Sequence, residues 1–113
     1  DVTAFGSPSD IRLKENIEVI ADPLSKVLKL KGVTFNYKDT GKKSTGLIAQ
    51  DLEEVLPEVV YETHDINDDN NKFKAVRYGN TVGLLVEAIK EQQTIINRLE
   101  ERIKKLEGEN NGD

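Results

Sequence analysis

A serine and a lysine near the start of the chain are the residues whose types and spacing could perform a reaction. Ser9 and Lys14 bound the string Ser-Asp-Ile-Arg-Leu-Lys. A serine hydroxyl becomes a useful nucleophile near neutral pH when a base lies beside it. A lysine amine can be that base when burial lowers its pKa, because desolvation disfavours the ammonium form. The spacing fits neither adjacent helical turns nor one face of a strand, so a turn must join the two groups; an ordinary surface turn is the alternative.

Other residues that could hold a metal or a nucleotide lack the necessary pattern. Asp65, Asn67 and Asp69 imitate the start of a calcium-binding loop, but Asn70 stands where such a loop needs Gly and Val76 where it needs Glu. We therefore expect a solvated hairpin tip there, and neither a metal nor a cofactor in the chain. A single histidine cannot build a histidine-based metal site, and no Gly-rich nucleotide loop is present. A site built between subunits stays open.

Composition indicates one compact domain in a very polar chain. The 113 residues are 36% hydrophobic and 33% charged, so a small core would be marginal and part of the apolar surface is expected to lie against other copies. A net charge of -5 without a basic patch disfavours nucleic-acid binding. No apolar run approaches the ~20 residues of a membrane span, and the absence of cysteine excludes disulfides. The lack of a starting Met suggests a piece of a longer polypeptide.

The elements expected to position the Ser9 motif are short. Residues 1–8 predict an extended connector from an upstream region, and residues 9–21 a short turn followed by a short strand. Asp22 as N-cap and Pro23 as first helical residue start a short helix, which Gly32 ends.

Alternating apolar and polar residues predict two hairpins after this helix. Gly46 in the first hairpin indicates a bulge or a close backbone approach. The expected order is strand 33–38, turn 39–43, strand 44–49, helix 50–56 stopped by Pro57, strand 59–63, polar loop 65–71 and strand 73–78.

A heptad pattern dominates the C-terminal part of the chain. Its a and d positions are Val82, Leu85, Ile89, Gln92, Ile96, Leu99, Ile103 and Leu106. All are apolar except Gln92, which predicts a seam that supercoils against a partner helix. We expect a coiled-coil helix over residues 81–107, about 40 Å long, and a disordered tail over residues 108–113; an amphipathic helix packed on its own sheet is the alternative.

The number of helices in the coil is left open by these residues. Ile or Val at a with Leu at d favours two strands, whereas Ile95 at g and Val86 at e widen the apolar face. Gln92 could close a hydrogen-bonded layer in the core, and Arg102 at g and Glu107 at e are placed to pair between parallel helices.

The chain resembles a known family in three features taken together. These are the string SDIRLKENI, the string GLIAQDLEEVLPEVV over residues 46–60, and the long terminal helix. In this order they resemble the self-cleaving intramolecular chaperone domain at the C-termini of phage tail fibres, tailspikes, neck appendages and endosialidases. A related domain occurs in the membrane-tethered myelin regulatory factor. The resemblance spans residues 9–106 and implies an α+β body over residues 9–80 with a trimeric parallel coiled coil.

The resemblance also implies a reaction and the residues that perform it. Ser9 would be the nucleophile and Lys14 its base, in an autocatalytic serine endopeptidase that acts once on its own Pro8–Ser9 bond. Asp10 and Arg12 would hold the geometry of the turn, and Asn16 would orient the same turn. Cleavage would depend on assembly of the trimer.

The function implied is a folding aid for a phage fibre. Three copies would trimerise, register the upstream fibre or spike during folding in the host cytoplasm, and leave the mature virion after cleavage. The physical reason is that non-local β-pairings form slowly, and tying chains together raises their effective concentration. The alternatives are a structural trimerisation tip that never cleaves, and the autocleavage domain of a membrane-tethered transcription factor. Neither a nucleic acid nor a membrane is an expected partner.

Overall fold

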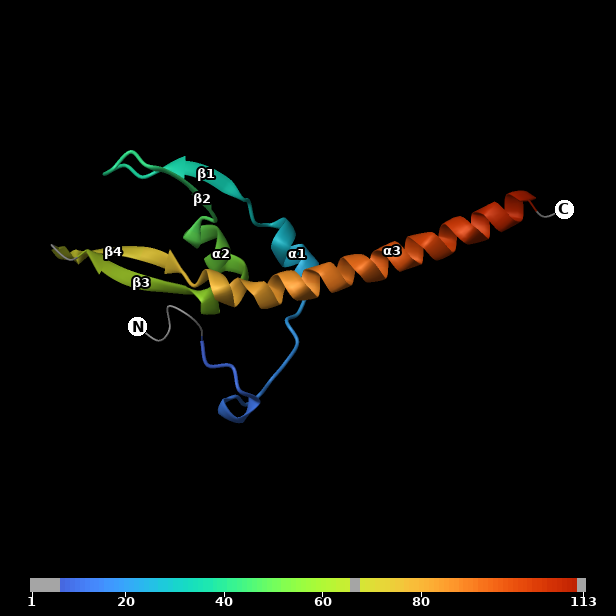
Figure 1. Cartoon of the computed structure of the whole chain (residues 1–113), viewed down its shortest axis with the longest axis horizontal. Helices are drawn as coiled ribbons and strands as arrows, with labels where there is room; N and C mark the ends of the chain where they lie inside the picture. Colours follow the sequence, from blue (N-terminus) through green and yellow to red (C-terminus); the bar gives the residue numbers. More distant parts are fainter. Residues whose placement is uncertain (1–6, 66–67, 112–113) are drawn as a thin grey trace.

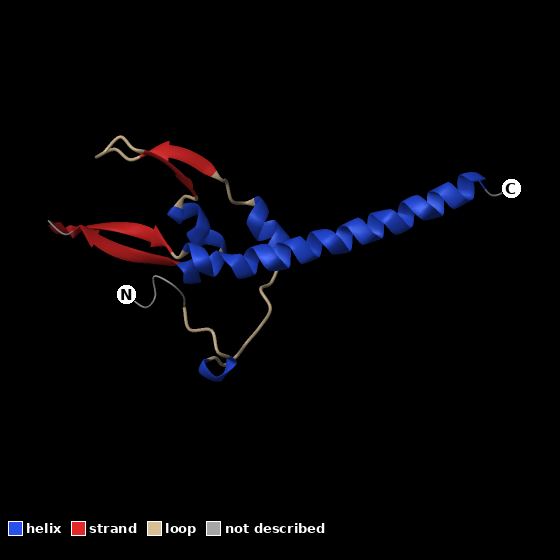
Figure 2. Ribbon diagram, in the orientation of Figure 1, coloured by secondary structure: helices blue, strands red, loops and turns tan. Residues whose placement is uncertain are grey.

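The computed structural model describes residues 7–65 and 68–111 of the chain. It is an α+β structure, as the sequence predicts, with two separate antiparallel hairpins, short helices and one long C-terminal helix. The molecule is elongated, 77 × 41 × 24 Å, because the long helix projects far beyond the hairpins and short helices (Figure 1). Colouring by secondary structure shows both hairpins at the end opposite to the tip of this helix (Figure 2).

A small core joins the short helices to the start of the long one. Helix α2 (Ala49–Val55) ends just before Pro57, which begins the 3₁₀ helix η3 (Pro57–Val59). The two largest fully buried side chains are Leu52 of α2 and Leu84 at the start of α3 (Val82–Asn111). The other members of the buried apolar cluster are Val55, Leu56 and Val59. Partly buried apolar residues pack around this core: Ile20, Val27, Leu30, Leu47, Val60 and Val76. The core is small and centres on α2, η3 and the first turns of α3.

Helix α1 (Pro23–Leu28) starts at Pro23, as predicted, but the Asp22 side chain does not cap it. Asp22 has a left-handed backbone, with φ 48°, and its side chain makes no capping hydrogen bond. Instead the backbone N–H of Leu24 donates to Oε1 of Glu91 on α3, over 3.2 Å. A carboxylate from the helix against which α1 packs therefore does the capping work that we expected of Asp22. The helix also ends at Leu28, before Gly32.

Both hairpins are present, with boundaries that differ from the expected ones. Strand β1 (Val33–Asn36) pairs with β2 (Lys43–Gly46), Val33 lying opposite Gly46. Strand β3 (Val60–Asp65) pairs with β4 (Asp68–Val76), Val60 lying opposite Val76. The backbone of residues 68–71, expected as part of a polar loop, belongs to β4. Within this stretch the pairing with β3 is irregular: residue 65 lies opposite residue 68 and residue 64 opposite residue 72. Residues 66–67 lie outside the described residues.

Gly46 allows the close backbone approach predicted for it. A Cβ atom at this position would overlap the hydroxyl of Tyr78. That hydroxyl accepts a hydrogen bond from the Leu47 backbone N–H over 2.9 Å, which ties the first hairpin to η4 (Tyr78–Thr81) at the start of α3.

Helix α3 is longer than the range expected from the heptads. Its 30 residues correspond to about 45 Å. Residues 108–111, expected in a disordered tail, are helical, and residues 112–113 lie outside the described residues. Gly108 is less favourable in a helix than Ala by about 1 kcal/mol. The helix nevertheless continues through it, because the residues before it favour helix.

Candidate functional site

The Ser9 motif folds as a tight turn. The 3₁₀ helix η2 (Ile11–Leu13) begins after Asp10, whose side chain accepts a hydrogen bond from the Arg12 backbone N–H over 2.9 Å. The Lys14 backbone N–H donates to the Ile11 carbonyl over 3.1 Å and closes the turn. As a result Lys14 Nζ lies 2.8 Å from Ser9 Oγ and donates a hydrogen bond to it. The turn therefore brings the two residues together in space.

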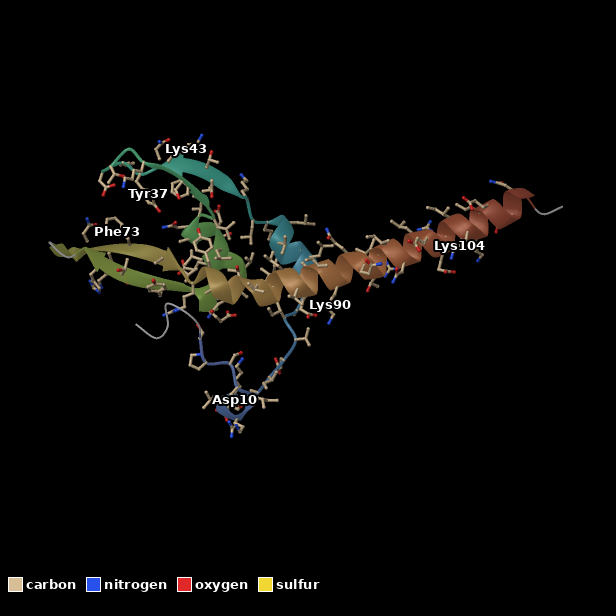
Figure 3. All side chains as sticks on the ribbon, viewed as in Figure 1. Asp10, Tyr37, Lys43, Phe73, Lys90 and Lys104 are labelled. Carbon is tan, nitrogen blue, oxygen red and sulfur yellow. The ribbon has the colours of Figure 1, made fainter. Side chains whose placement is uncertain are left out.

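Asp10 and Arg12 form an ion pair on the outside of this turn. The Arg12 side chain donates from Nη2 to Oδ2 of Asp10 over 2.8 Å and from Nε to Oδ1 over 3.1 Å. The Arg12 side chain lowers the pKa of the Asp10 carboxyl, and Asp10 raises the pKa of Arg12. Figure 3 places Asp10 at the outermost point of the motif segment, away from the hairpins and α3. Asp10 and Arg12 are two positions apart in the chain, and both belong to the turn that connects Ser9 to Lys14.

The segment after the turn does not form the strand that we expected before residue 21. Asn16 has a left-handed backbone, with φ 53°, and changes the direction of the chain two residues after Lys14. Ile17 and Val19 are exposed, and the segment continues to α1 without pairing to either hairpin. Alternating apolar residues predicted a strand, but no neighbouring strand is available to pair with them.

A cleft joins the motif to a distant part of the chain. Its volume is about 1020 Å³, and its lining residues are Ser7, Pro8, Ser9, Lys14, Arg77, Gly79, Asn80 and Gly83. The sequence singled out Pro8, Ser9 and Lys14. It missed Ser7 and the second part of the set, which comes from Arg77, from η4 and from the first turn of α3. Nothing in the local pattern of residues 77–83 marks them as part of a site, because only the tertiary fold brings them to the motif.

The arrangement is suited to attack on the preceding peptide bond. Ser9 Oγ belongs to the residue that follows the Pro8 carbonyl, so the covalent chain keeps the hydroxyl near that carbonyl carbon. Lys14 as an ammonium group donates to Oγ, and a neutral amine in the same position would accept the hydroxyl proton. This contact is of the kind that acyl transfer needs between a nucleophile and a base. Both side chains are exposed in the single chain, so the burial of the lysine that the sequence argument expects is not found there.

The sequence of this region matches a known protein family. Residues 9–61 match the family model described as chaperone of endosialidase, whose model name is Peptidase S74. This segment belongs to the chaperone-of-endosialidase family. The match begins at Ser9 and runs through η2, α1, the first hairpin and α2 into β3.

Several tail-fibre proteins resemble the chain over most of its length. The long tail fiber protein Gp37 of Enterobacteria phage K3 is 38% identical over 100 residues, which cover 84% of this chain and 8% of that protein. The protein of the same name from Salmonella phage S16 is 30% identical over 106 residues, which cover 87% of this chain and 14% of that protein. The chain thus spans a small part of the tail-fibre proteins that it matches.

A relative of a different kind is similar to about half of the chain. Myelin regulatory factor homolog 1 of Caenorhabditis elegans is 40% identical over 74 residues, which cover 55% of this chain and 8% of that protein. Proteins with very different names therefore resemble this chain.

The predicted seam of α3 is exposed in the single chain. Among its residues, Ile89 is 63% exposed and Leu106 57%, while Leu84 and Ala88 of the same helix are buried. Helix α3 packs against α1, and Leu84 belongs to the same buried cluster as Leu52 of α2. Seven apolar seam residues are exposed like Ile89: Val82, Leu85, Ile89, Ile96, Leu99, Ile103 and Leu106. The helix therefore buries one face within its own chain and leaves the heptad face largely exposed.

The described residues offer no metal centre and no membrane span. Over residues 7–65 and 68–111 no group of three or more His, Asp or Glu side chains is placed to hold a metal ion. Nor does a helix in this part of the chain have the length and apolar character needed to cross a bilayer.

Proposed function

We propose that the chain is a C-terminal intramolecular chaperone, which trimerises, registers an upstream tail fibre during folding, and then releases itself by cutting before Ser9. The observation that carries the proposal is the 2.8 Å contact between Lys14 Nζ and Ser9 Oγ, next to the Pro8 carbonyl. The family match that begins at Ser9 supports it. The client would be a phage fibre in the host cytoplasm during virion assembly, as the names of the tail-fibre relatives suggest.

The reaction consumes one water molecule and produces two chains. Ser9 Oγ attacks the Pro8 carbonyl carbon, while the neutral amine of Lys14 takes the hydroxyl proton. The carbon–nitrogen bond between Pro8 and Ser9 breaks, and Lys14 gives the proton to the departing Ser9 nitrogen. The resulting ester is hydrolysed by water, which leaves a carboxylate on Pro8 and a free hydroxyl and amine on Ser9.

Trimerisation through α3 would cover the apolar face that the single chain exposes. Apolar burial contributes about 25 cal/mol for each Å² removed from water, so a seam of seven large apolar residues supplies a strong drive to associate. A parallel coil holds three fibre chains at a common end and in register, which raises their effective concentration for slow β-pairing. Gln92 would form the polar layer that fixes this register.

Two other functions are compatible with the same body. A structural tip that trimerises and stays attached needs the α3 seam but not the Ser9–Lys14 contact. An autocleavage domain of a membrane-tethered transcription factor is favoured by the match to myelin regulatory factor homolog 1. That function keeps the reaction and changes only the protein that is released.

The proposal is tested by expressing the domain with its native upstream fibre and running a denaturing gel. We expect the wild type to yield two fragments, and Ser9→Ala and Lys14→Ala to remain full length while still forming trimers. Ser25→Ala and Lys31→Ala, which change the same residue types outside the cleft, should cleave as the wild type does. A wild type that trimerises and stays uncut would contradict autoproteolysis and leave the structural tip.

A further inference from the structure

Arg77 lies between β4 and η4 and lines the same cleft as Pro8, Ser9 and Lys14. Its backbone N–H donates to the Val59 carbonyl over 2.8 Å, which fixes this position to η3. Its guanidinium carbon lies 4.3 Å from the centre of the Tyr61 ring on β3. A guanidinium over an aromatic face is attracted to the ring, so Tyr61 restricts where this cation lies.

The charge around Arg77 differs from that around Arg12. Arg12 directs its side-chain donors to the Asp10 carboxylate. In the described part of the chain, no carboxylate oxygen lies within 4.0 Å of the Arg77 guanidinium, and no Asp or Glu lines the cleft. The N–H groups of the Arg77 guanidinium therefore have no carboxylate partner among these residues. They are available to donate to another anionic oxygen.

Attack on the Pro8 carbonyl produces such an oxygen. When Ser9 Oγ adds to the carbonyl carbon, negative charge develops on the carbonyl oxygen, and catalysis of acyl transfer depends on donors placed to receive that charge. Lys14 is committed to the hydroxyl proton. Among the described residues that line the cleft, Arg77 is the one other cation. Hydrogen bonds from a guanidinium to an anionic oxygen are roughly twice as strong as those between neutral groups.

We propose that Arg77 binds the carbonyl oxygen of Pro8 and stabilises the negative charge that forms there, with Tyr61 as its positioning residue. This inference rests on the proposed autoproteolysis before Ser9. Arg77 keeps all its protons through the reaction, because the only proton transferred in the first step passes from Ser9 Oγ through Lys14 to the Ser9 nitrogen.

The test measures the first-order rate of fragment release in the full-length polypeptide that carries the domain. Arg77→Ala should slow release about 10²- to 10³-fold, the usual loss when an oxyanion donor is removed, and Arg77→Lys should lie between this variant and the wild type. Guanidinium ion, added far below its unfolding concentration, should restore part of the rate of Arg77→Ala. Sodium chloride at the same ionic strength should not.

Tyr61 supplies a second and milder variant. Tyr61→Leu removes the ring under the guanidinium and should slow release about threefold, whereas Tyr61→Phe keeps the ring and should match the wild type. Sedimentation of each variant measures assembly independently of cleavage.

The outcomes separate this inference from the function on which it rests. If the wild type cleaves and Ser9→Ala does not, autoproteolysis stands. Arg77→Ala within about twofold of the wild type would then overturn the role of Arg77. A slow Arg77→Ala that guanidinium does not rescue, or that fails to assemble, would show a structural role and also overturn it. An uncut, assembled wild type would refute both proposals.

Discussion

The body around α2 and the motif segment before α1 are stabilised by different interactions. Leu52 and Leu84 in the body are fully buried, whereas Ile11 and Leu13 in the motif are each 72% exposed. The body is held by apolar burial, and the motif turn by local hydrogen bonds and the Asp10–Arg12 pair. The body thus has a buried core within one chain. The motif is shaped by hydrogen bonds between neighbouring residues, and its apolar side chains are not buried in the single chain.

The largest expected effect comes from emptying the core of the body. Leu52→Ala should lower the free energy of unfolding by about 2–5 kcal/mol, because it leaves a cavity in a core of very few residues. Such a loss is a large part of the stability of a small domain. Thermal unfolding followed by circular dichroism measures it. Leu28→Ala, which truncates an exposed leucine on α1, is the matched control and should cost far less; equal losses would contradict the contrast between buried and exposed regions.

The next effect concerns assembly and should leave the body intact. Ile96→Asp places a charge at an a position that is 46% exposed in the single chain, so it should abolish trimers while the body around Leu52 stays folded. Sedimentation at micromolar concentration measures the oligomer. Thr94→Asp puts the same charge at a position off the seam and should still assemble. Trimers of Ile96→Asp, or a wild type that sediments as a monomer, would contradict the role given to α3.

The smallest effect concerns the motif turn. Asp10→Asn removes the carboxylate that caps η2 and pairs with Arg12, so cleavage should slow several-fold while thermal stability stays unchanged, since surface pairs contribute little. Glu15→Gln removes one negative charge from the same segment, and its cleavage rate should stay that of the wild type. A loss of global stability in Asp10→Asn would break the separation between motif and body.

The same pair predicts the pH dependence of the turn. Because Arg12 lowers the pKa of Asp10, the folded turn favours the carboxylate. Its contribution is complete above the unfolded Asp value of about 4 and is lost as pH falls through the lowered value of the folded state. Nuclear magnetic resonance titration of the Asp10 carboxyl measures this directly. A carboxyl that titrates at or above the usual Asp value would contradict the pairing.

Much of this fold could be predicted because its signals are local. The heptad residues from Val82 to Leu106 show a long helix, alternation shows both hairpins, and Gly46 shows a close approach. The pairing of Ser9 with Lys14 followed from a motif string together with the turn that five residues require. Self-association of α3 stays a prediction, because the exposed seam gives a reason for it and not the partner.

What the sequence could not predict depends on contacts between distant residues. The pattern around Asp22 predicts where α1 starts, but not that Glu91 of α3 caps it. The apolar residues Ile17 and Val19 alternate as in a strand but have no strand beside them. Arg77 reaches the cleft through the β4–η4 junction, and nothing adjacent to it in sequence indicates a site.

The most direct test of the central claim is the intact mass of the fragment released from assembled full-length protein. The account predicts a fragment whose first residue is Ser9 with a free amine, formed by the wild type and not by Ser9→Ala. Its partner should end at Pro8 with a free carboxylate, which carries one ¹⁸O atom in place of ¹⁶O when the reaction runs in ¹⁸O-labelled water. Assembled wild type that retains its full mass, or that is cut at another bond, would contradict the account.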